Sequence, residues 1–255
     1  MRYLFFLLVL LAGCAEPPKI IEETQQAVTE VVLPITLEVQ DTVQSVIPPP
    51  PKPVSTYPIT DRGIEHIIRW EVTSEAYYRK HLTRCVWPGG ASGVTCGIGY
   101  DFGHQSTRTI LRDWQGHPHA GRLASLSGIT GEKAKAILPQ YRDIEVSYED
   151  ALRVFRESTI PVYHASAVRA YGPALTEQNP GSVDAITGNT MNRGGSMVGS
   201  RNLEKREIKD KCLPRFDQAC TAAQLRAQCR LWVNTNLEKG LCGRRYDEAV
   251  LTESY

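Results

Sequence analysis

The sequence lacks the short motifs that mark several classes of enzyme and metal-binding protein. Its seven cysteines form no Cys-x-x-Cys pair, and none stands at a zinc-ligand spacing from a histidine. No Gly-x-Ser-x-Gly segment is present, so the turn that presents the serine of α/β-hydrolases is missing. No second long apolar run follows the one at the start of the chain. We therefore expect no metal, no cofactor, no serine-triad chemistry and no further transmembrane segment.

The N-terminus has the pattern of a secretory signal. Arg2 supplies a positive charge, and the apolar run that follows is too short to span a bilayer as a mature helix. The run ends in Leu-Ala-Gly-Cys14, which resembles the bacterial lipobox, where the cysteine is lipidated and becomes the new N-terminus. Ala15, rather than an aspartate, resembles the pattern for sorting to the outer membrane. We predict a signal peptide over residues 1–13 and a lipid anchor at Cys14, on the periplasmic face of the outer membrane; the alternative is an ordinary cleaved signal.

Residues 14–58 are interpreted as the lipidated cysteine and a tether. Residues 15–57 contain no glycine and one aromatic residue. The proline-rich run at residues 48–53 favours an extended polyproline II spacer, at about 3.1 Å per residue. Such a tether would let the globular domain, predicted over residues 59–255, reach a partner away from the membrane surface.

Positive and negative charges nearly balance in the whole chain but are unevenly spread. Of 29 basic and 28 acidic residues, three basic and six acidic ones precede residue 58, which leaves a net charge of about +4 on the rest. A mildly basic domain suits an anionic polymer. It falls well short of the basic surplus typical of nucleic-acid-binding proteins, so we expect no nucleic-acid partner.

The cysteines other than Cys14 are predicted to form disulfides. Six remain, and an even number in an oxidising compartment is typical of disulfide pairing. Cys85 and Cys96 flank a glycine-bearing stretch and are the favoured pair. The other four are expected to pair among themselves around the C-terminal helices: Cys212, Cys220, Cys229 and Cys242.

The pattern of the globular part favours a mostly helical α+β fold. Residues 63–78 carry apolar side chains and Glu71 at helical spacing, with Asp61 as the candidate N-cap. Small and β-branched residues over 85–103 predict a loop and a short hairpin, and the later segments are mostly helical. The expected plan is one helix, a small β-hairpin and a helical bundle.

Two segments of this domain suit cleavage of a glycosidic bond. The reaction needs a carboxylic acid beside the leaving oxygen and a second polar or anionic group that activates water or stabilises the developing positive charge. Glu71, at the end of the first predicted helix, is the candidate acid. Thr95 and Asp101 lie six residues apart, and a turn at Gly97 and Gly99 would bring both toward Glu71.

These residues resemble the phage-type (T4-like) lysozymes. That pattern is a helix ending in Glu, an aromatic residue about seven positions on, and then Thr-Ile-Gly-x-Gly; here Thr-Cys-Gly-Ile-Gly begins at Thr95. The resemblance implies that Glu71 is the general acid and that Thr95 helps to hold the nucleophilic water, with Gly97 and Tyr100 as substrate contacts. The distance to the following tyrosines favours Glu71 over Glu75, a competing acid one turn on.

The chain departs from the phage enzymes in one respect. They keep an aspartate shortly before the threonine, and residues 87–92 contain none. The pesticin-like muramidases are a closer match, because their aspartate follows the threonine by six residues, which implies that role for Asp101. Downstream, Asn-Arg-Gly at Asn192 and Arg193 resembles a family segment and implies substrate contacts, although a structural role is an equal alternative. The run Gly-Leu-x-x-Arg-Arg-x-x-Glu-Ala over residues 240–249 resembles the family's closing segment.

The function predicted from these residues is that of a muramidase, a hydrolase of the β-1,4 bond between N-acetylmuramic acid and N-acetylglucosamine in peptidoglycan. A lytic transglycosylase, which needs one Glu and no water, is the alternative enzyme. A peptidoglycan-binding lipoprotein without catalytic activity is the alternative from another class, because fold does not dictate function.

The lipid anchor at Cys14 is tested by intact-mass analysis of protein extracted from membranes. The mature chain should lack residues 1–13 and carry the added mass of a diacylglyceryl group and an acyl chain, because a lipobox cysteine becomes the modified N-terminus. A soluble product with an unmodified N-terminus would contradict the anchor.

Overall fold

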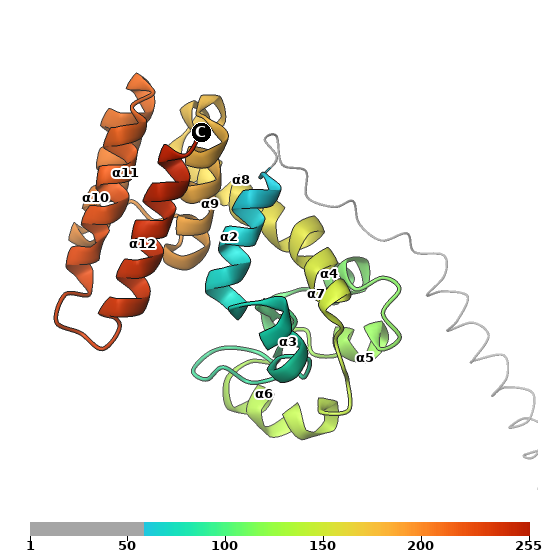
Figure 1. The fold of residues 1–255 in the computed structure, drawn as a ribbon. Coiled ribbons are helices and arrows are strands. Elements are labelled where there is room, and N and C mark those ends of the chain that lie inside the picture. Colours follow the sequence, from blue (N-terminus) through green and yellow to red (C-terminus); the bar gives the residue numbers. More distant parts are fainter. Residues whose placement is uncertain (1–58) are drawn as a thin grey trace, which may run out of the picture. The chain divides into compact units, whose positions relative to one another are not determined.

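The computed structural model describes residues 59–255, so the predicted signal peptide, Cys14 and the tether lie outside the described residues. The described part is mostly helical and contains a two-stranded antiparallel sheet, as the pattern predicts (Figure 1). No helix in this part of the chain is long and apolar enough to cross a membrane. In chain order its helices and strands are α2 (Asp61–Val72), α3 (Glu75–His81), β1 (Thr95–Cys96), β2 (Tyr100–Asp101), α4 (Thr107–Asp113), α5 (Ala120–Ala124), α6 (Gly131–Ile137), α7 (Tyr148–Val154), α8 (Ile160–Tyr171), α9 (Pro180–Arg193), α10 (Leu203–Glu207), α11 (Gln218–Ala227) and α12 (Glu238–Glu253).

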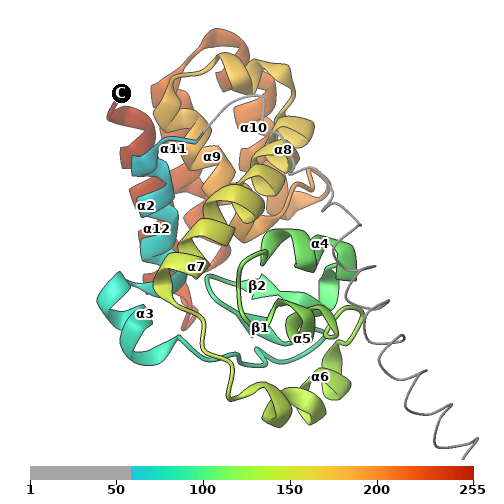
Figure 2. The ribbon, with the colours of Figure 1, turned by 90° about the vertical axis from the view of Figure 1, so that its right-hand side faces the viewer.

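Apolar side chains gather in two cores, which define two lobes. The hairpin lobe contains the strands and α3 to α7, and its core is built around Phe102 and Trp114. The helical lobe contains α8 to α12, and its core includes Val183 and Leu225. A π-helical segment, Phe155–Thr159, joins α7 to α8 without a break. Figure 2 shows the strands with α4, α5 and α6 on one side, and the helices of the helical lobe on the other.

Helix α2 belongs to both lobes. Its isoleucines lie in the core of the hairpin lobe, whereas its N-terminus is bonded to α9. The backbone N–H of Thr60 donates to Asp184 Oδ1 at 3.1 Å, and the Thr60 hydroxyl donates to the other oxygen of the same buried carboxylate. Thr60 is also the N-cap, since its Oγ1 accepts from the N–H of Gly63 at 3.1 Å. The prediction of Asp61 as the cap is therefore wrong by one residue.

The helix predicted over residues 63–78 is in fact two helices. Helix α2 ends at Val72, because Thr73 adopts a left-handed φ of 70°. Ser74 then caps α3 by accepting from the N–H of Tyr77 at 3.1 Å. The apolar periodicity runs through this break, so the spacing alone did not reveal it. As a result, Glu71 stands in the last turn of α2.

The predicted hairpin is present and is very short. Strands β1 and β2 pair antiparallel, with Thr95 opposite Asp101 and Cys96 opposite Tyr100. The turn between them requires Gly97 at a φ of +64° and Gly99 at +71°, a region that other residues rarely adopt.

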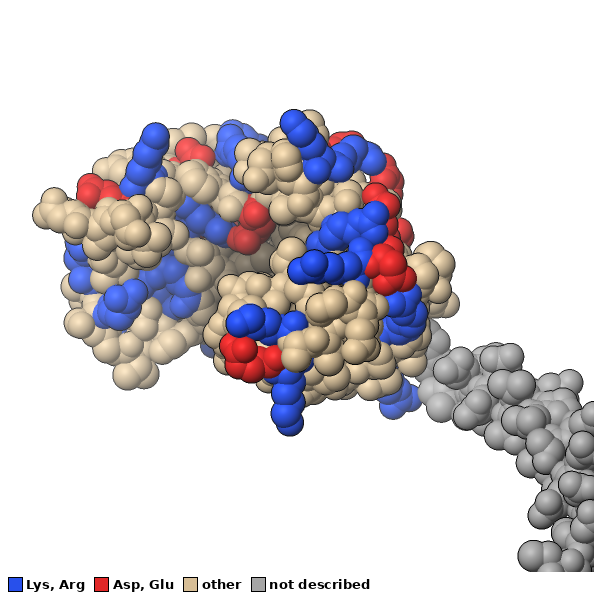
Figure 3. All heavy atoms as spheres, turned by 90° about the horizontal axis from the view of Figure 1, so that it is seen from below, with Lys and Arg blue, Asp and Glu red and all other residues tan. Residues whose placement is uncertain are grey.

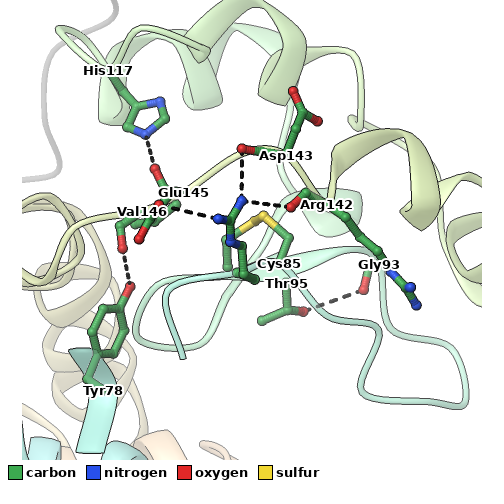
Figure 4. Close-up of a disulfide and its surroundings, with 11 residues drawn as sticks. Tyr78, Cys85, Gly93, Thr95, His117, Arg142, Asp143, Glu145 and Val146 are labelled. Atoms are coloured by element: carbon green, nitrogen blue, oxygen red, sulfur yellow. Dashed lines mark hydrogen bonds and ion pairs between the residues drawn. A yellow bond between two sulfur atoms is a disulfide. The ribbon is translucent and has the colours of Figure 1, made fainter. Parts of the chain in front are cut away.

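The disulfide predictions are confirmed. Cys85 and Cys96 are bonded, and the remaining pairs are Cys212–Cys220 and Cys229–Cys242. Figure 4 shows the Cys85 disulfide close to Thr95. Val86, on the segment before the hairpin, and Thr95, in β1, form two backbone hydrogen bonds with each other, at 2.8 and 2.9 Å. Strand β1 is therefore bonded to the segment before it as well as to β2.

Removing the Cys85–Cys96 disulfide tests how much it stabilises the fold. The double variant Cys85→Ala/Cys96→Ala should lower the free energy of unfolding by about 2–4 kcal/mol, because the bond restricts the unfolded chain. Urea unfolding followed by circular dichroism measures the change. Free thiols at both positions of the wild type, found by non-reducing peptide mapping, would refute the pairing.

Candidate functional site

Glu71 is held by an arginine from the other end of the chain. Arg244 Nη1, on α12, donates to Glu71 Oε1 at 2.8 Å, across 173 residues of sequence. The Arg244 side chain is 5% exposed and that of Glu71 is 27% exposed. Arg244 Nη2 also donates to the carbonyl of Gly188 on α9 at 3.3 Å. The candidate acid is thus fixed in place while part of its carboxylate remains accessible.

A buried polar cluster lies behind Arg244. Its centre is Glu248, which is 0% exposed, receives a hydrogen bond from Asn189 at 2.9 Å and forms ion pairs with Arg244 and Arg245. Burial raises the pKa of the Glu248 carboxyl, and the two guanidinium charges oppose that rise. Gln228 extends the cluster by accepting from Asn189 at 3.0 Å. Helix α9 and the closing segment that resembles the phage-type family, residues 240–249, therefore meet here, behind Glu71.

Thr95 and Asp101 form a side-chain pair on the hairpin. They are opposite each other in the register. Because Thr95 directs its backbone N–H and C=O to Val86, on its other side, this is a non-hydrogen-bonded pair, in which the Cα atoms of antiparallel strands are about 4.5 Å apart and the side chains are closest. The turn predicted from Gly97 and Gly99 thus brings the two residues together.

The Asp101 carboxylate is held by backbone N–H groups. Both of its oxygens accept from Gly93, at 3.0 Å each, and Oδ1 also accepts from Gly103 at 3.0 Å. A Cβ at position 93 would lie 2.4 Å from Oδ1, so only glycine permits this approach. The Thr95 hydroxyl donates to the carbonyl of the same Gly93 at 3.4 Å (Figure 4). Asp101 therefore has a structural role in the hairpin, and its side chain remains 23% exposed.

Burial raises the pKa of the phenol of Tyr163, on α8, and the charges of Glu71 and Asp101 raise it further. No sequence signal singles Tyr163 out, because it follows Pro161 in an apolar segment without a motif. Its position became evident from the fold alone.

One face of the described part of the molecule is hollowed. Figure 3 shows this recess, with acidic and basic side chains at its edges. Glu71 comes from the end of α2 and Asp101 from the hairpin. Chemically, a carboxylic acid and a second carboxylate are the groups required for acid-assisted attack of water on a glycosidic bond.

Other predicted site residues have different surroundings. Tyr100 is 6% exposed, and its hydroxyl donates to Asp113 at 2.9 Å, so this placement does not support a substrate contact. Gly97 lies at the hairpin turn, where an added Cβ would meet Trp114 at 3.4 Å. Glu75 is on α3, where it pairs with Arg79 on the surface.

Asn192 and Arg193, at the end of α9, have different surroundings. Arg193 Nη1 donates to Gln228 at 2.8 Å, and its guanidinium lies 5.6 Å from the centre of the Trp232 ring, as expected of a structural residue. Asn192 is exposed. Both residues line a pocket of the helical lobe rather than bonding to Glu71.

Comparison with known proteins gives a family match without a function. A family described as a domain of unknown function (DUF8812) matches residues 66–171, which is less than half of the chain. The matched range contains Glu71, Thr95, Asp101 and Tyr163 and ends with α8. No curated protein matches the sequence. Among residues 59–255, no three His, Cys, Asp or Glu side chains gather where they could hold a metal ion.

His66, on α2 beside this cluster, makes stability depend on pH. Burial lowers its pKa to about 4, and the charges of Arg69, Arg244 and Arg245 lower it further. The unfolded histidine binds a proton near pH 6.5. The contribution of neutral His66 to the free energy of unfolding is therefore fully present above pH 6.5. It decreases by about 1.4 kcal/mol per pH unit as the pH falls toward 4.

This dependence is tested by urea unfolding at pH 7.5 and pH 5. Between these values, His66→Gln should lose about 2 kcal/mol less than the wild type, because glutamine has no proton to bind. His81→Gln, at an exposed histidine of α3, is the matched control and should behave as the wild type. Equal losses in the two variants would show that His66 is not the responsible group.

Proposed function

We propose that this protein is a muramidase that hydrolyses the β-1,4 bond between N-acetylmuramic acid and N-acetylglucosamine in peptidoglycan. One observation carries the proposal: Arg244 of α12 holds Glu71, at the end of α2, while the Glu71 side chain remains 27% exposed. The register partner of Asp101 is Thr95, the residue to which the resemblance assigns the water. The order of a helix ending in Glu, a hairpin and a helical bundle supports a lysozyme-like fold.

The proposed reaction divides the work between the two lobes. The Glu71 carboxyl gives its proton to the leaving glycosidic oxygen. Asp101 accepts a proton from a water molecule that the Thr95 hydroxyl helps to orient, and this water attacks the anomeric carbon. Held by Gly93 and Gly103, the Asp101 carboxylate is positioned before the substrate arrives, which limits the reorganisation that the reaction requires.

The proposed compartment is the bacterial envelope, with the protein attached through lipid on Cys14. The three disulfides support it, because such bonds form and persist mainly outside the cytoplasm. The proposed partner is the peptidoglycan strand, which lies in the same compartment as an anchored periplasmic domain.

Activity on purified cell walls, measured by loss of turbidity, tests the proposed roles. Glu71→Gln should remove nearly all activity, because it leaves no proton for the leaving group. Asp101→Asn should lower the rate by about 10²–10⁴-fold, the range expected for loss of a general base. Glu75→Gln is the matched control, since that carboxylate is 53% exposed and paired with Arg79; it should retain wild-type activity. Circular dichroism confirms that each variant is folded.

Mass spectrometry of the digestion products identifies the reaction. Hydrolysis yields reducing-end muramyl sugars. If the products are 1,6-anhydro sugars and Asp101→Asn is fully active, the protein is a lytic transglycosylase instead. Binding to walls without any cleavage by the wild type would make it a non-catalytic peptidoglycan-binding protein.

A further inference from the structure

The loop closed by the Cys212–Cys220 disulfide exposes an aromatic side chain between α10 and α11. The short turn Leu213–Arg215 is capped by Phe216, whose side chain is 55% exposed. Pro214 and Arg215, which precede it, are exposed as well. Residues 214–216 form the tip of this loop. The tip therefore presents an apolar ring and a guanidinium group to the surroundings of the molecule.

Phe216 occupies a backbone conformation that suits glycine. Its φ is 53° and its ψ is 33°, in the left-handed region where bulky residues are rarely found. Glycine or asparagine would adopt this conformation at a lower cost. The exposed ring also forgoes the free energy that burial in a core would provide. Neither the backbone nor the packing accounts for an aromatic residue here, which indicates a role outside the fold.

The tip is held firmly in place. The N–H of Phe216 donates to the carbonyl of Leu213, and the N–H of Asp217 donates to that of Cys212, at 3.1 Å each. The buried side chain of Gln178 also donates to the carbonyl of Leu213, at 3.0 Å. The disulfide closes the loop behind these bonds. A partner that binds the ring therefore pays little entropy for ordering the tip.

The tip lies at the end of the helical lobe where the described chain begins. Gln178, which bonds to the tip's turn, comes just before α9, and Asp184, in the second turn of α9, bonds to Thr60. The hydroxyl oxygen of Tyr255 is 3.3 Å from Thr60 Oγ1. Figure 1 shows the turn between α10 and α11, the C-terminus and the start of α2 at the same end of this lobe. The chain thus enters the domain on the side that carries the tip.

Cations at this end are available to an anionic partner. Among residues 59–255, the Arg215 side chain makes no ion pair or hydrogen bond, whereas the carboxylate of Asp217 is used as the cap of α11 and accepts from Cys220 at 2.8 Å. The exposed Arg62 lies 5.5 Å from the centre of the Tyr255 ring, which is 46% exposed. Aromatic rings beside cations are typical of surfaces that rest in a lipid headgroup layer, where the ring enters the acyl region and the cation stays at the phosphates.

We propose that the tip is a membrane-docking element, in which Phe216 enters the acyl region of a bilayer and Arg215 binds lipid phosphate groups. The chain favours this partner, because its predicted lipid anchor, Cys14, lies 45 residues before Ile59. A segment of this length spans at most about 150 Å. The bilayer is therefore always near the tip, and a contact that is weak by itself forms when it is intramolecular.

Docking through the tip would orient the domain on the membrane. Thr60 stands at the end of α2 that lies near the tip, and Glu71 stands 11 residues further along the same helix. This separation is about 16 Å. The candidate acid would therefore face away from the bilayer. The inference goes beyond the proposed function and does not depend on the proposed reaction.

Co-sedimentation with lipid vesicles tests the tip without the anchor. The mature chain from residue 14 carries Cys14→Ser, so that only the protein surface can bind. Vesicles of phosphatidylethanolamine and phosphatidylglycerol should bind this chain, and adding Phe216→Asn should weaken the binding about tenfold, because an apolar ring no longer leaves water. Adding Leu237→Asn is the matched control, at a leucine that is 53% exposed at the other end of α12; it should leave the binding unchanged.

Two further measurements on the same chain separate docking from a structural role. Phe216→Asn should keep or raise the free energy of unfolding in urea, because asparagine tolerates the left-handed conformation. Arg215→Glu should weaken binding to the phosphatidylglycerol vesicles about fivefold or more, because anionic lipid attracts the guanidinium. It should have a smaller effect on vesicles of phosphatidylcholine alone.

Fluorescence of the anchored protein tests the docked position. In the full-length lipidated protein in vesicles, the tryptophan of Phe216→Trp should be quenched by brominated acyl chains, because the tip enters the bilayer. The tryptophan of Leu237→Trp, at the other end of α12, should not be quenched. Equal quenching of the two would contradict docking through the tip.

The outcomes separate this proposal from the proposed function. If the Cys14→Ser chain binds no vesicles, or if Phe216→Asn and Leu237→Asn lose binding equally, the tip is not a membrane contact. A loss of binding by Phe216→Asn together with a lower free energy of unfolding would assign Phe216 to the fold and overturn the proposal. Binding to purified cell walls, and not to vesicles, that depends on Phe216 would assign the tip to peptidoglycan instead. None of these measurements uses hydrolysis, so docking can be supported in a protein that cleaves no glycan, or refuted in one that does.

Discussion

The ion pair between Arg244 and Glu71 is the contact on which the candidate site depends. Helix α2 ends one residue after Glu71, at Val72, so the helix itself gives the carboxylate little support on its C-terminal side. Arg244 supplies that support, and it is fixed in turn by the buried Glu248. Buried charges of this kind are stable only when every member of the cluster has its partners. The position of one partly exposed carboxylate thus rests on side chains from α9, the segment around Gln228, and α12.

The Asp101 carboxylate is held by backbone N–H groups that are close to it in the sequence. Asp101 needs no distant partner, because the N–H groups of Gly93 and Gly103 lie within eight residues of it. Its position depends on the hairpin alone, and the hairpin depends on Gly93, on the glycine turn and on the disulfide beside Thr95. Each lobe therefore positions one acidic group, and the distance between the groups is determined by how the lobes pack together through α2 and the helix from α7 to α8. Any change at that junction alters the candidate site without changing either carboxylate's own contacts.

The features that could be predicted from sequence are those with short-range causes. Glycines at 97 and 99 indicate a tight turn, and this turn leads directly to the Thr95–Asp101 pair. Cys85 and Cys96, on either side of the glycine-bearing stretch before this turn, are only 11 residues apart, so their pairing could be predicted as well. The break at Thr73 was missed because the apolar spacing continues through it, although Ser74 is a good cap for α3. A resemblance picked out the segment that contains Arg244, but no role for Arg244 was predicted, because no local rule links residues 173 positions apart.

The residues that α2 contacts are far away in the sequence, and this separation determines when the domain can assemble. Thr60 bonds to Asp184, 124 residues later, and Glu71 bonds to Arg244, 173 residues later. Contacts of such sequence separation form late, because a long loop must close before they contribute. A chain that is still emerging from a ribosome or a translocation channel can form its hairpin and disulfide early, but it has no Arg244 to meet Glu71 until α12 has emerged. Helix α2 is therefore fixed only after α12 has been made, and a chain that lacks α12 contains Glu71 without the arginine that holds it.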